Sequence, residues 1–219
     1  MVPNKGRRTA LRLLAALPLA AASARAQEAG QHARLNVSYR EIPPQPVPAG
    51  SAIEVVEFFW YGCPYCFQFH PHFQAWVHRQ PADVTVRRVP AVFRQSWIPH
   101  ARMYYTLERL GALDRLHDEV YKSYHVDEVP LNTADAIADW AAKHGLDRER
   151  WLTVYRSDEV SGRLMDAQDQ LRRYAVSGTP SVVVGGRYLT SSGMTPGVAA
   201  MIPVLDELVA LARGQRGVR

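Results

Sequence analysis

Two cysteines, Cys63 and Cys66, are the residues of this 219-residue chain that could most directly carry out chemistry. They are separated by two residues and lie where an apolar, β-branched stretch meets a stretch with helical spacing. The start of a helix offers unpaired backbone N–H groups and the positive end of the helix dipole, so it favours a thiolate. This spacing and placement predict a pair that carries out thiol–disulfide exchange.

The pattern around the cysteines predicts the elements that must position them. Ile53 to Trp60 is apolar on both alternating sets of positions, as in a central strand covered on two faces, with Glu57 as its single buried charge. From Pro64 to about Gln80 the apolar residues recur with helical spacing, and we expect Pro71 to kink this helix. The valines of 84–89 predict a strand that closes a β-α-β unit.

The rest of the chain is predicted to be mostly helical before it returns to the sheet. Apolar repeats predict helices over 101–110, 113–124, 134–144, 148–155 and 159–174, with Asn132 or Thr133 as an N-cap and Gly145 as a C-cap. Val182 to Leu189 predicts a hairpin whose two-residue turn is Gly185-Gly186. We expect a last helix from Thr195 to about Ala212 and an edge strand at Leu35 to Tyr39.

Residues 1–26 have the pattern of a secretory signal peptide. Basic residues come first, then an apolar run of about ten residues, which is shorter than the roughly 20 needed to cross a bilayer. Ala24-Arg25-Ala26 fits the small-x-small rule, so we expect cleavage before Gln27 and a periplasmic mature protein. The pair Arg7-Arg8 leaves open whether export uses the Sec or the twin-arginine route.

The charge of the mature chain argues against binding to polyanions. The whole sequence has 26 Lys and Arg against 21 Asp and Glu, but the signal peptide contains five of the basic residues and none of the acidic ones. A mature chain with balanced charge gives no reason to expect nucleic acid or an anionic membrane as a partner. After export, its two cysteines are the only residues that could form a disulfide.

The order and spacing of three motifs resemble the thioredoxin superfamily and, more narrowly, the DsbA family. The first is Glu-Phe-Phe-x-x-x-Cys-Pro-x-Cys at 57–66. The others are Val-Ser-Gly-Thr-Pro at 176–180, followed by Val-Gly-Gly-Arg-Tyr at 184–188, and a helical block lies in between. The resemblance covers nearly all of residues 34–213.

The resemblance implies an α/β thioredoxin fold, a mixed central sheet flanked by helices, with an inserted all-helical domain. The expected parts are the signal peptide, a first thioredoxin segment at 27–94, the helical insertion at 95–165, a second thioredoxin segment at 166–213 and a flexible tail at 214–219.

The resemblance also implies roles for the two sulfurs and their neighbours. Cys63 is expected to be the exposed thiol that forms a mixed disulfide with clients, and Cys66 the buried thiol that resolves it. The helix start should lower the pKa of Cys63 well below the roughly 8.5 of a free thiol. Pro180 corresponds to a cis-proline beside the sulfurs, and Thr179 would offer its backbone to the client and its side chain to the thiolate environment.

Three further residues are singled out around this centre. Tyr65 stands where the commonest family pattern has histidine, which predicts a weaker oxidant because a phenol is neutral at physiological pH. Glu57 and either Arg88 or Arg87 match a buried acid and base that could ease proton transfer when Cys66 leaves, or that could form a purely structural ion pair.

Aromatic residues flank the motif. Trp60, Phe67 and Trp76 are expected to be core residues, whereas Tyr61, Pro64 and Tyr65 are candidates for an exposed apolar surface on which unfolded clients dock.

The sequence analysis predicts a dithiol oxidase that introduces disulfides into reduced, unfolded exported proteins. The expected partner for reoxidation is a DsbB-like membrane protein, and we expect a monomer with no cofactor and no metal. Three alternatives remain open: a disulfide reductase or isomerase, a non-catalytic chaperone that uses the helical domain, and a metal chaperone that binds copper through Cys63, Cys66 and His70. His72 and His78 are read as surface histidines.

Overall fold

The computed structural model describes residue 1 and residues 33–46 and 52–216. The signal peptide beyond Met1 and the cleavage position before Gln27 therefore lie outside the described residues. Within the described part of the chain, none of the helices has the length and apolar character that crossing a bilayer requires.

The described residues form a mixed five-stranded sheet with the order β1-β5-β4-β2-β3. Strand β2 (Ile53–Phe59) pairs in parallel with β3 (Val84–Pro90) and antiparallel with β4 (Ser181–Val184). Strand β5 (Tyr188–Ser191) links β4 to the short edge strand β1 (Arg40–Glu41). All seven residues of β2 are buried, which confirms the predicted central strand.

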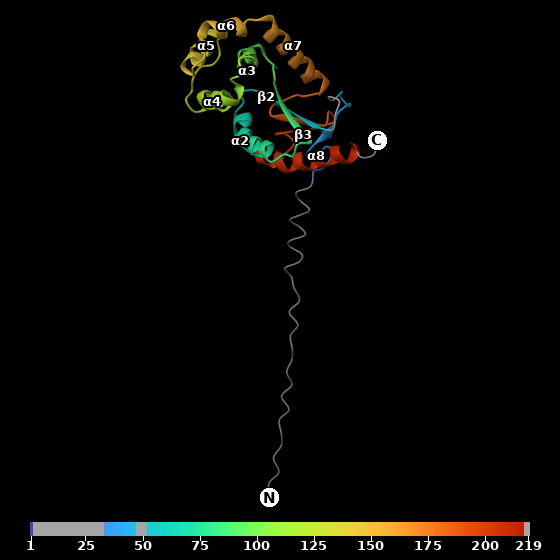
Figure 1. Ribbon diagram of the computed structural model, residues 1–219. Coiled ribbons are helices and arrows are strands. Elements are labelled where there is room, and N and C mark those ends of the chain that lie inside the picture. Colours follow the sequence, from blue (N-terminus) through green and yellow to red (C-terminus); the bar gives the residue numbers. More distant parts are fainter. Residues whose placement is uncertain (2–32, 47–51, 217–219) are drawn as a thin grey trace. The chain divides into compact units, whose positions relative to one another are not determined.

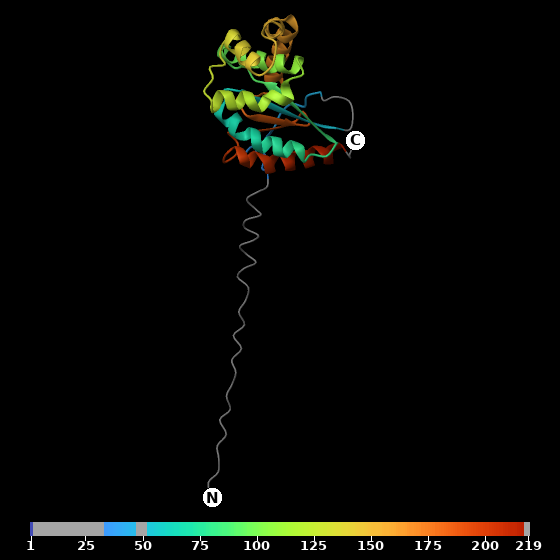
Figure 2. The ribbon, with the colours of Figure 1, turned by 60° about the vertical axis from the view of Figure 1, so that its left-hand side comes forward.

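Helices α2 (Pro64–His78) and α8 (Met201–Arg216) cover one face of the sheet. They run side by side in Figure 2, and the indole N–H of Trp76 on α2 donates to Asp206 on α8 at 2.7 Å. The buried residues between these helices and the sheet form one apolar cluster, which includes Val55, Phe69, Phe73, Val182, Val184, Leu205 and Leu208. The predicted β-α-β unit is therefore confirmed.

The predicted helical block covers the other side of the sheet (Figure 1). It consists of a 3-10 turn at Gln95–Trp97 and the helices α3 (Ile98–Arg109), α4 (Leu113–His125), α5 (Ala134–Lys143), α6 (Arg148–Tyr155) and α7 (Asp158–Arg173). Thr133 is the N-cap of α5 and accepts a hydrogen bond from the backbone N–H of Ala136. Helix α7 is continuous across the boundary expected between 165 and 166.

The last helix begins later and ends later than predicted. A 3-10 turn at Val198–Ala200 precedes α8, which starts at Met201 rather than at Thr195. Gly197, with φ of 118°, has a backbone conformation that a helix does not allow, so the chain cannot be helical from Thr195. Because α8 continues to Arg216, residues 214–216 are helical and not part of a flexible tail.

Two smaller predictions at the sheet edge are wrong. Leu35 and Tyr39 make an isolated bridge around a turn in which Asn36 has φ of 60°, and the edge strand follows at Arg40. The hairpin connection has three residues, because Val184 pairs with Tyr188 and leaves Arg187 in the turn. Gly185 and Gly186 both have positive φ, as predicted for this turn.

Candidate redox-active site

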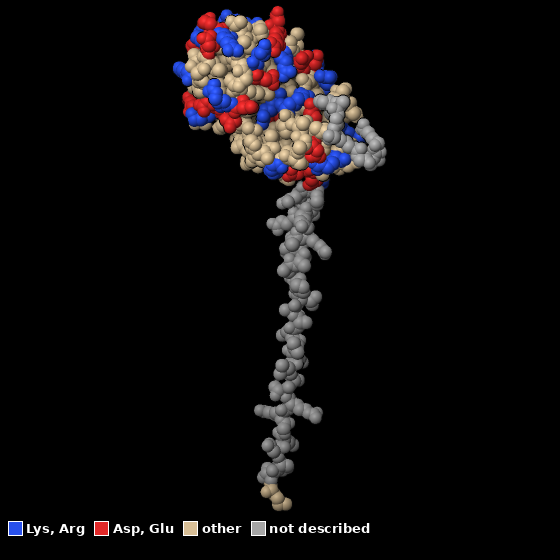
Figure 3. Space-filling model, viewed as in Figure 1, with Lys and Arg blue, Asp and Glu red and all other residues tan. Residues whose placement is uncertain are grey.

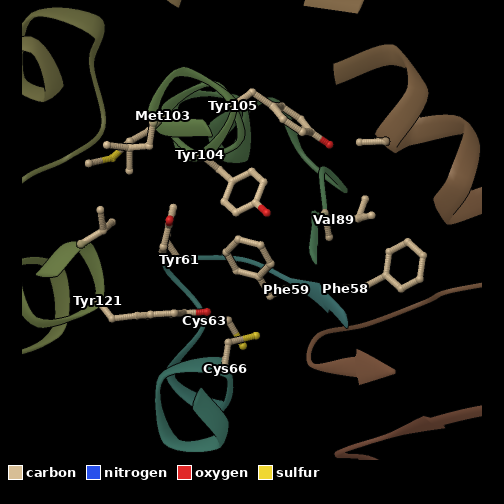
Figure 4. Packing of buried hydrophobic residues seen from close by; sticks show 14 of the residues in the cluster. Phe58, Phe59, Tyr61, Cys63, Cys66, Val89, Met103, Tyr104, Tyr105 and Tyr121 are labelled. Carbon is tan, nitrogen blue, oxygen red and sulfur yellow. The ribbon is translucent and has the colours of Figure 1, made fainter. Parts of the chain in front are cut away.

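The two cysteines lie at the start of α2, as predicted. Cys63 is the N-cap residue, with extended backbone angles, and Pro64 occupies the first helical position, where its missing N–H removes no helical hydrogen bond. Both cysteines are free thiols in this structure. The side chains come from the junction of β2 with α2 and point into the core beneath α3 and α4 (Figure 4).

Cys63 is less accessible than predicted. Its relative exposure is 7%, against 0% for Cys66, so the expected order holds but Cys63 is not an open surface thiol. The reason is the loop before β4, whose Thr179 carbonyl oxygen lies 3.4 Å from the Cys63 sulfur. A client must therefore reach one edge of this sulfur beside Thr179.

The pKa of Cys63 is lowered to about 6. The largest cause is a hydrogen bond from the Cys66 thiol; burial opposes the shift, and hydrogen bonds from Thr179 and from the backbone N–H groups of Cys66 and Tyr65 add to it. The helix start thus contributes as predicted, but the neighbouring thiol contributes more. Cys63 is a thiolate at neutral pH.

Cys66 has the opposite electrostatic environment. Burial raises its pKa well above 9.0, and the adjacent charge of Cys63 raises it further. One sulfur is therefore negative and reachable, while the other remains protonated and closed to solvent. This asymmetry is what exchange through a mixed disulfide requires.

The structure brings Pro180 to the sulfurs from more than 100 residues away in sequence. The Thr179–Pro180 peptide bond is cis, as expected from the resemblance. The Ser181 hydroxyl donates to the Gly178 carbonyl oxygen at 2.7 Å and holds this loop at the start of β4, next to β2. Thr179 presents its backbone carbonyl to Cys63.

Glu57 pairs with Arg88 and not with Arg87. The register of β2 and β3 places Glu57 opposite Arg88, and the guanidinium donates to the carboxylate at 2.9 Å. Glu57 is 1% exposed, and burial raises its pKa although Arg88 and His70 act to lower it. Its second oxygen, Oε1, is buried and has no hydrogen-bond partner among the described residues.

Glu57 is not the only buried charge of β2, which corrects the sequence-based expectation. Glu54 is 7% exposed and accepts from Arg87 at 2.7 Å, and Arg87 also donates to Gln170 of α7. Alternation along β2 and β3 explains the two pairs: Glu54 and Glu57 face opposite sides of the sheet, and each meets the arginine of its own face.

The three candidates for exposed apolar surface divide into two groups. Pro64 is exposed and Tyr65 is 58% exposed, so both can contact a client. Tyr61 is fully buried, contrary to the prediction, because its hydroxyl bonds to His117 of α4 at 2.6 Å and its ring packs on Phe59 and Tyr121 (Figure 4). Trp76 is buried as predicted, whereas Trp60 and Phe67 are partly buried.

The histidines of α2 do not converge with the cysteines. His70 is buried and its Nε2 lies 2.7 Å from Asp118 of α4, whereas His72 and His78 are exposed. Among the described residues, no three metal-ligating side chains gather in one place. His70 is therefore tied to the helical block.

Sequence reasoning missed the residues that α4 contributes beneath the sulfurs. His117, Asp118 and Tyr121 lie about fifty residues from the motif in sequence, and their spacing is that of an ordinary amphipathic helix. The helical repeat predicts which face of α4 is buried but does not show that this face meets the cysteines.

Comparisons with known proteins agree with this site. Residues 88–208 match the DSBA-like thioredoxin domain family. Over 199 residues the chain is 37% identical to the thiol:disulfide interchange protein DsbA of Burkholderia cepacia, covering 90% of this chain and 93% of the relative. The corresponding protein of Azotobacter vinelandii is 36% identical over 181 residues, covering 82% and 85%.

Solved structures show the same architecture. The crystal structure of Pseudomonas aeruginosa DsbA superposes with a TM-score of 0.78 at 35% identity, covering 82% of this chain and 94% of that one. DsbA from Xylella fastidiosa gives 0.75 at 34% identity, covering 81% and 96%. On the combined grounds of its motif, its fold and these relatives, the chain belongs to the DsbA family of thiol:disulfide oxidoreductases.

Proposed function

We propose that this chain is a periplasmic dithiol oxidase that transfers its Cys63–Cys66 disulfide to exported proteins. The observation that carries the proposal is the contrast within the motif: the pKa of Cys63 is lowered to about 6, while that of Cys66 is raised well above 9.0. Because the reduced protein holds a stabilised thiolate, electrons are readily accepted from a client. DsbA itself is the standard example of this coupling.

The reaction proceeds through two exchanges. A client thiolate attacks the Cys63 sulfur, the Cys63–Cys66 bond breaks, and its electron pair leaves on Cys66, which then takes up a proton. A second client thiolate attacks the client sulfur of the mixed disulfide and expels Cys63 as its stabilised thiolate. The client gains one disulfide and the protein becomes the dithiol.

The surface beside Cys63 suits unfolded clients of varied sequence. Helix α2 has no Asp, Glu, Lys or Arg, and the face over it in Figure 3 is largely free of charge. Exposed Pro64 and Tyr65 supply apolar contact, and the backbone of Thr179 beside cis-Pro180 offers strand-like pairing to an extended peptide.

The remaining parts of the proposal concern location and partners. Residues 1–26 would direct export and be removed before Gln27, and a DsbB-like membrane protein would restore the disulfide. The protein would act as a monomer, since one chain supplies both sulfurs and the Thr179–Pro180 loop.

A peptide-oxidation assay tests the function. The oxidised protein should convert a two-cysteine peptide to its disulfide form, Cys63→Ser should be inactive, and Cys66→Ala should accumulate mixed disulfides that identify clients. A non-catalytic chaperone would still protect clients from aggregation with Cys63→Ser. Equilibrium with glutathione that favours the Cys63–Cys66 disulfide would instead indicate a reductase, and stoichiometric copper in the purified reduced protein would indicate a metal chaperone.

We further propose that Glu57, held by Arg88, exchanges a proton with Cys66. Glu57→Gln should lower the exchange rate about tenfold and remove one ionisation from its pH profile, because an amide cannot transfer a proton. Glu54→Gln is the matched control, being a buried β2 carboxylate that pairs with Arg87. An unchanged pH profile for Glu57→Gln would make the pair purely structural.

A further inference from the structure

Tyr121 buries a hydroxyl group that has no hydrogen-bond partner among the described residues. It lies on α4 within the helical block and is 1% exposed. Buried hydroxyls are nearly always hydrogen-bonded, so an unpartnered one in the core calls for an explanation. Packing alone does not supply one, because a phenylalanine ring would fill the same space.

The hydroxyl group of Tyr121 points toward the two cysteines (Figure 4). The ring is held in this orientation by Tyr61, whose centroid is 5.1 Å away, and by His70 at 4.9 Å. Beyond burial itself, the strongest influence on the pKa of the phenol is a negative charge on Cys66, ahead of Glu57, Tyr61 and Arg88. The hydroxyl therefore lies in the electrostatic field of Cys66.

Cys66 is the atom of the motif that most needs a donor during the reaction. When a client thiolate attacks Cys63, the broken bond leaves its electron pair on a sulfur that is 0% exposed. The backbone N–H of Trp60 offers one hydrogen bond to this sulfur, and Glu57 adds a negative charge that opposes ionisation. A further neutral donor would stabilise the leaving sulfur without the cost of burying another charge.

We propose that the Tyr121 hydroxyl donates a hydrogen bond to the Cys66 sulfur as that sulfur leaves. The phenol keeps its proton throughout, since burial raises its pKa well above 10.0. The electron pair of the broken disulfide remains on Cys66, and the proton that later neutralises it comes from another group. The inference rests on the proposed exchange function and assigns to the helical block a direct part in it.

A donor that acts on this transient anion has a distinctive kinetic consequence. The same anion forms when a thiol opens the Cys63–Cys66 disulfide and when Cys66 attacks a mixed disulfide to close it. Tyr121 therefore accelerates both directions by one factor. The redox equilibrium and the pKa of Cys63 do not depend on it, because in the stable reduced form Cys66 is a thiol.

Tyr121→Phe tests this, with glutathione as the thiol and disulfide. Opening of the oxidised protein by reduced glutathione and closure of the glutathione mixed disulfide should both slow by about tenfold or more, as expected for loss of a hydrogen bond to a charged group. Their ratio, the Cys63 pKa measured by thiolate absorbance and the melting temperature should stay close to wild type.

Tyr105→Phe is the matched control. Tyr105 is a buried tyrosine of the same core cluster, and its hydroxyl points away from the cysteines (Figure 4), so its loss should leave both rates unchanged. Wild-type rates in Tyr121→Phe to within about twofold would overturn the inference, as would a slowing accompanied by a shifted Cys63 pKa and a lower melting temperature. If wild type itself failed to react with glutathione, the proposed function would fail first.

Discussion

At the scale of single residues, the site depends on two cysteines three positions apart that ionise very differently. The Cys66 thiol donates to Cys63 and is the largest cause of the lowered Cys63 pKa, while burial keeps Cys66 itself protonated. One helical turn of separation thus converts a chemically symmetric pair into a nucleophile and a resolving thiol.

Tyr65 is expected to limit the oxidising power of the protein. It is 58% exposed between the two cysteines, and a histidine there would add a cationic donor near the thiolate. Tyr65→His should lower the Cys63 pKa further and shift the equilibrium with glutathione toward the reduced protein. Tyr65→Phe is the control for ring size, and an unshifted equilibrium in Tyr65→His would refute the prediction.

The stability of the reduced protein should depend on pH through Cys63. The folded pKa of about 6 lies below the model value of 9.0, so the thiolate stabilises the folded state. This contribution is complete above about pH 9 and is lost as the pH falls through about 6. Urea unfolding of the reduced and oxidised forms across this range measures it.

The oxidised form provides the baseline, because it has no Cys63 thiolate. The free energy of unfolding of the reduced form should rise relative to the oxidised form as the pH increases, and reduced Cys63→Ser should lose this rise. A difference that stays constant with pH would show that Cys63 is not a stabilised thiolate.

At the scale of elements, strand register selects which charges meet. Parallel pairing of β2 with β3 places Glu57 opposite Arg88, and alternation sends Glu54 and Arg87 to the other face. The position of Cys63 likewise follows from the end of β2, where the chain turns directly into α2. These placements are properties of paired elements and not of any one segment.

Helix α5 offers a test of local capping within the helical block. Thr133→Ala removes the side-chain acceptor for the Ala136 N–H and should lower the free energy of unfolding by about 1 kcal/mol. Thr133→Ser keeps the hydroxyl and should stay near wild type. Chemical denaturation of the three proteins makes the comparison, and equal midpoints would show that the cap contributes nothing.

At the scale of the whole molecule, the helical block and the sheet share one core. A single cluster of buried residues extends from Val56 and Phe58 of β2 to Ile137 of α5 and Leu171 of α7. The described residues from Ala33 onward form one compact unit. The insertion predicted as a separate all-helical domain is therefore packed as a continuous part of the thioredoxin fold.

This shared core predicts cooperative unfolding. Ile137→Ala, at a fully buried position of α5, should cost about 2 to 5 kcal/mol. It should weaken the hydrogen-exchange protection of β2 amides by the same free energy as that of α5 amides. Met165→Ala, at a 63% exposed position, is the control. Loss of protection confined to the helical block would show two separate folding units.

Much of the architecture was predictable because its signals are local. The β-α-β unit, the five helices of the insertion and the Thr133 cap follow from hydrophobic periodicity and capping chemistry within short segments. The errors lie where a distant contact decides. Tyr61 is buried because α4 covers it, and the edge strand begins at Arg40 because β5 is there to pair with it.

The sequence by itself determined the chemistry of the protein, because two cysteines at the junction of a strand and a helix suffice to predict thiol–disulfide exchange. Only the tertiary structure decided how that chemistry is tuned. It closed Thr179 over Cys63, chose Arg88 for Glu57 and directed the Tyr121 hydroxyl toward the sulfurs. The physical reason is that pKa values and hydrogen bonds depend on atoms a few ångströms away, and most of those atoms come from distant parts of the chain.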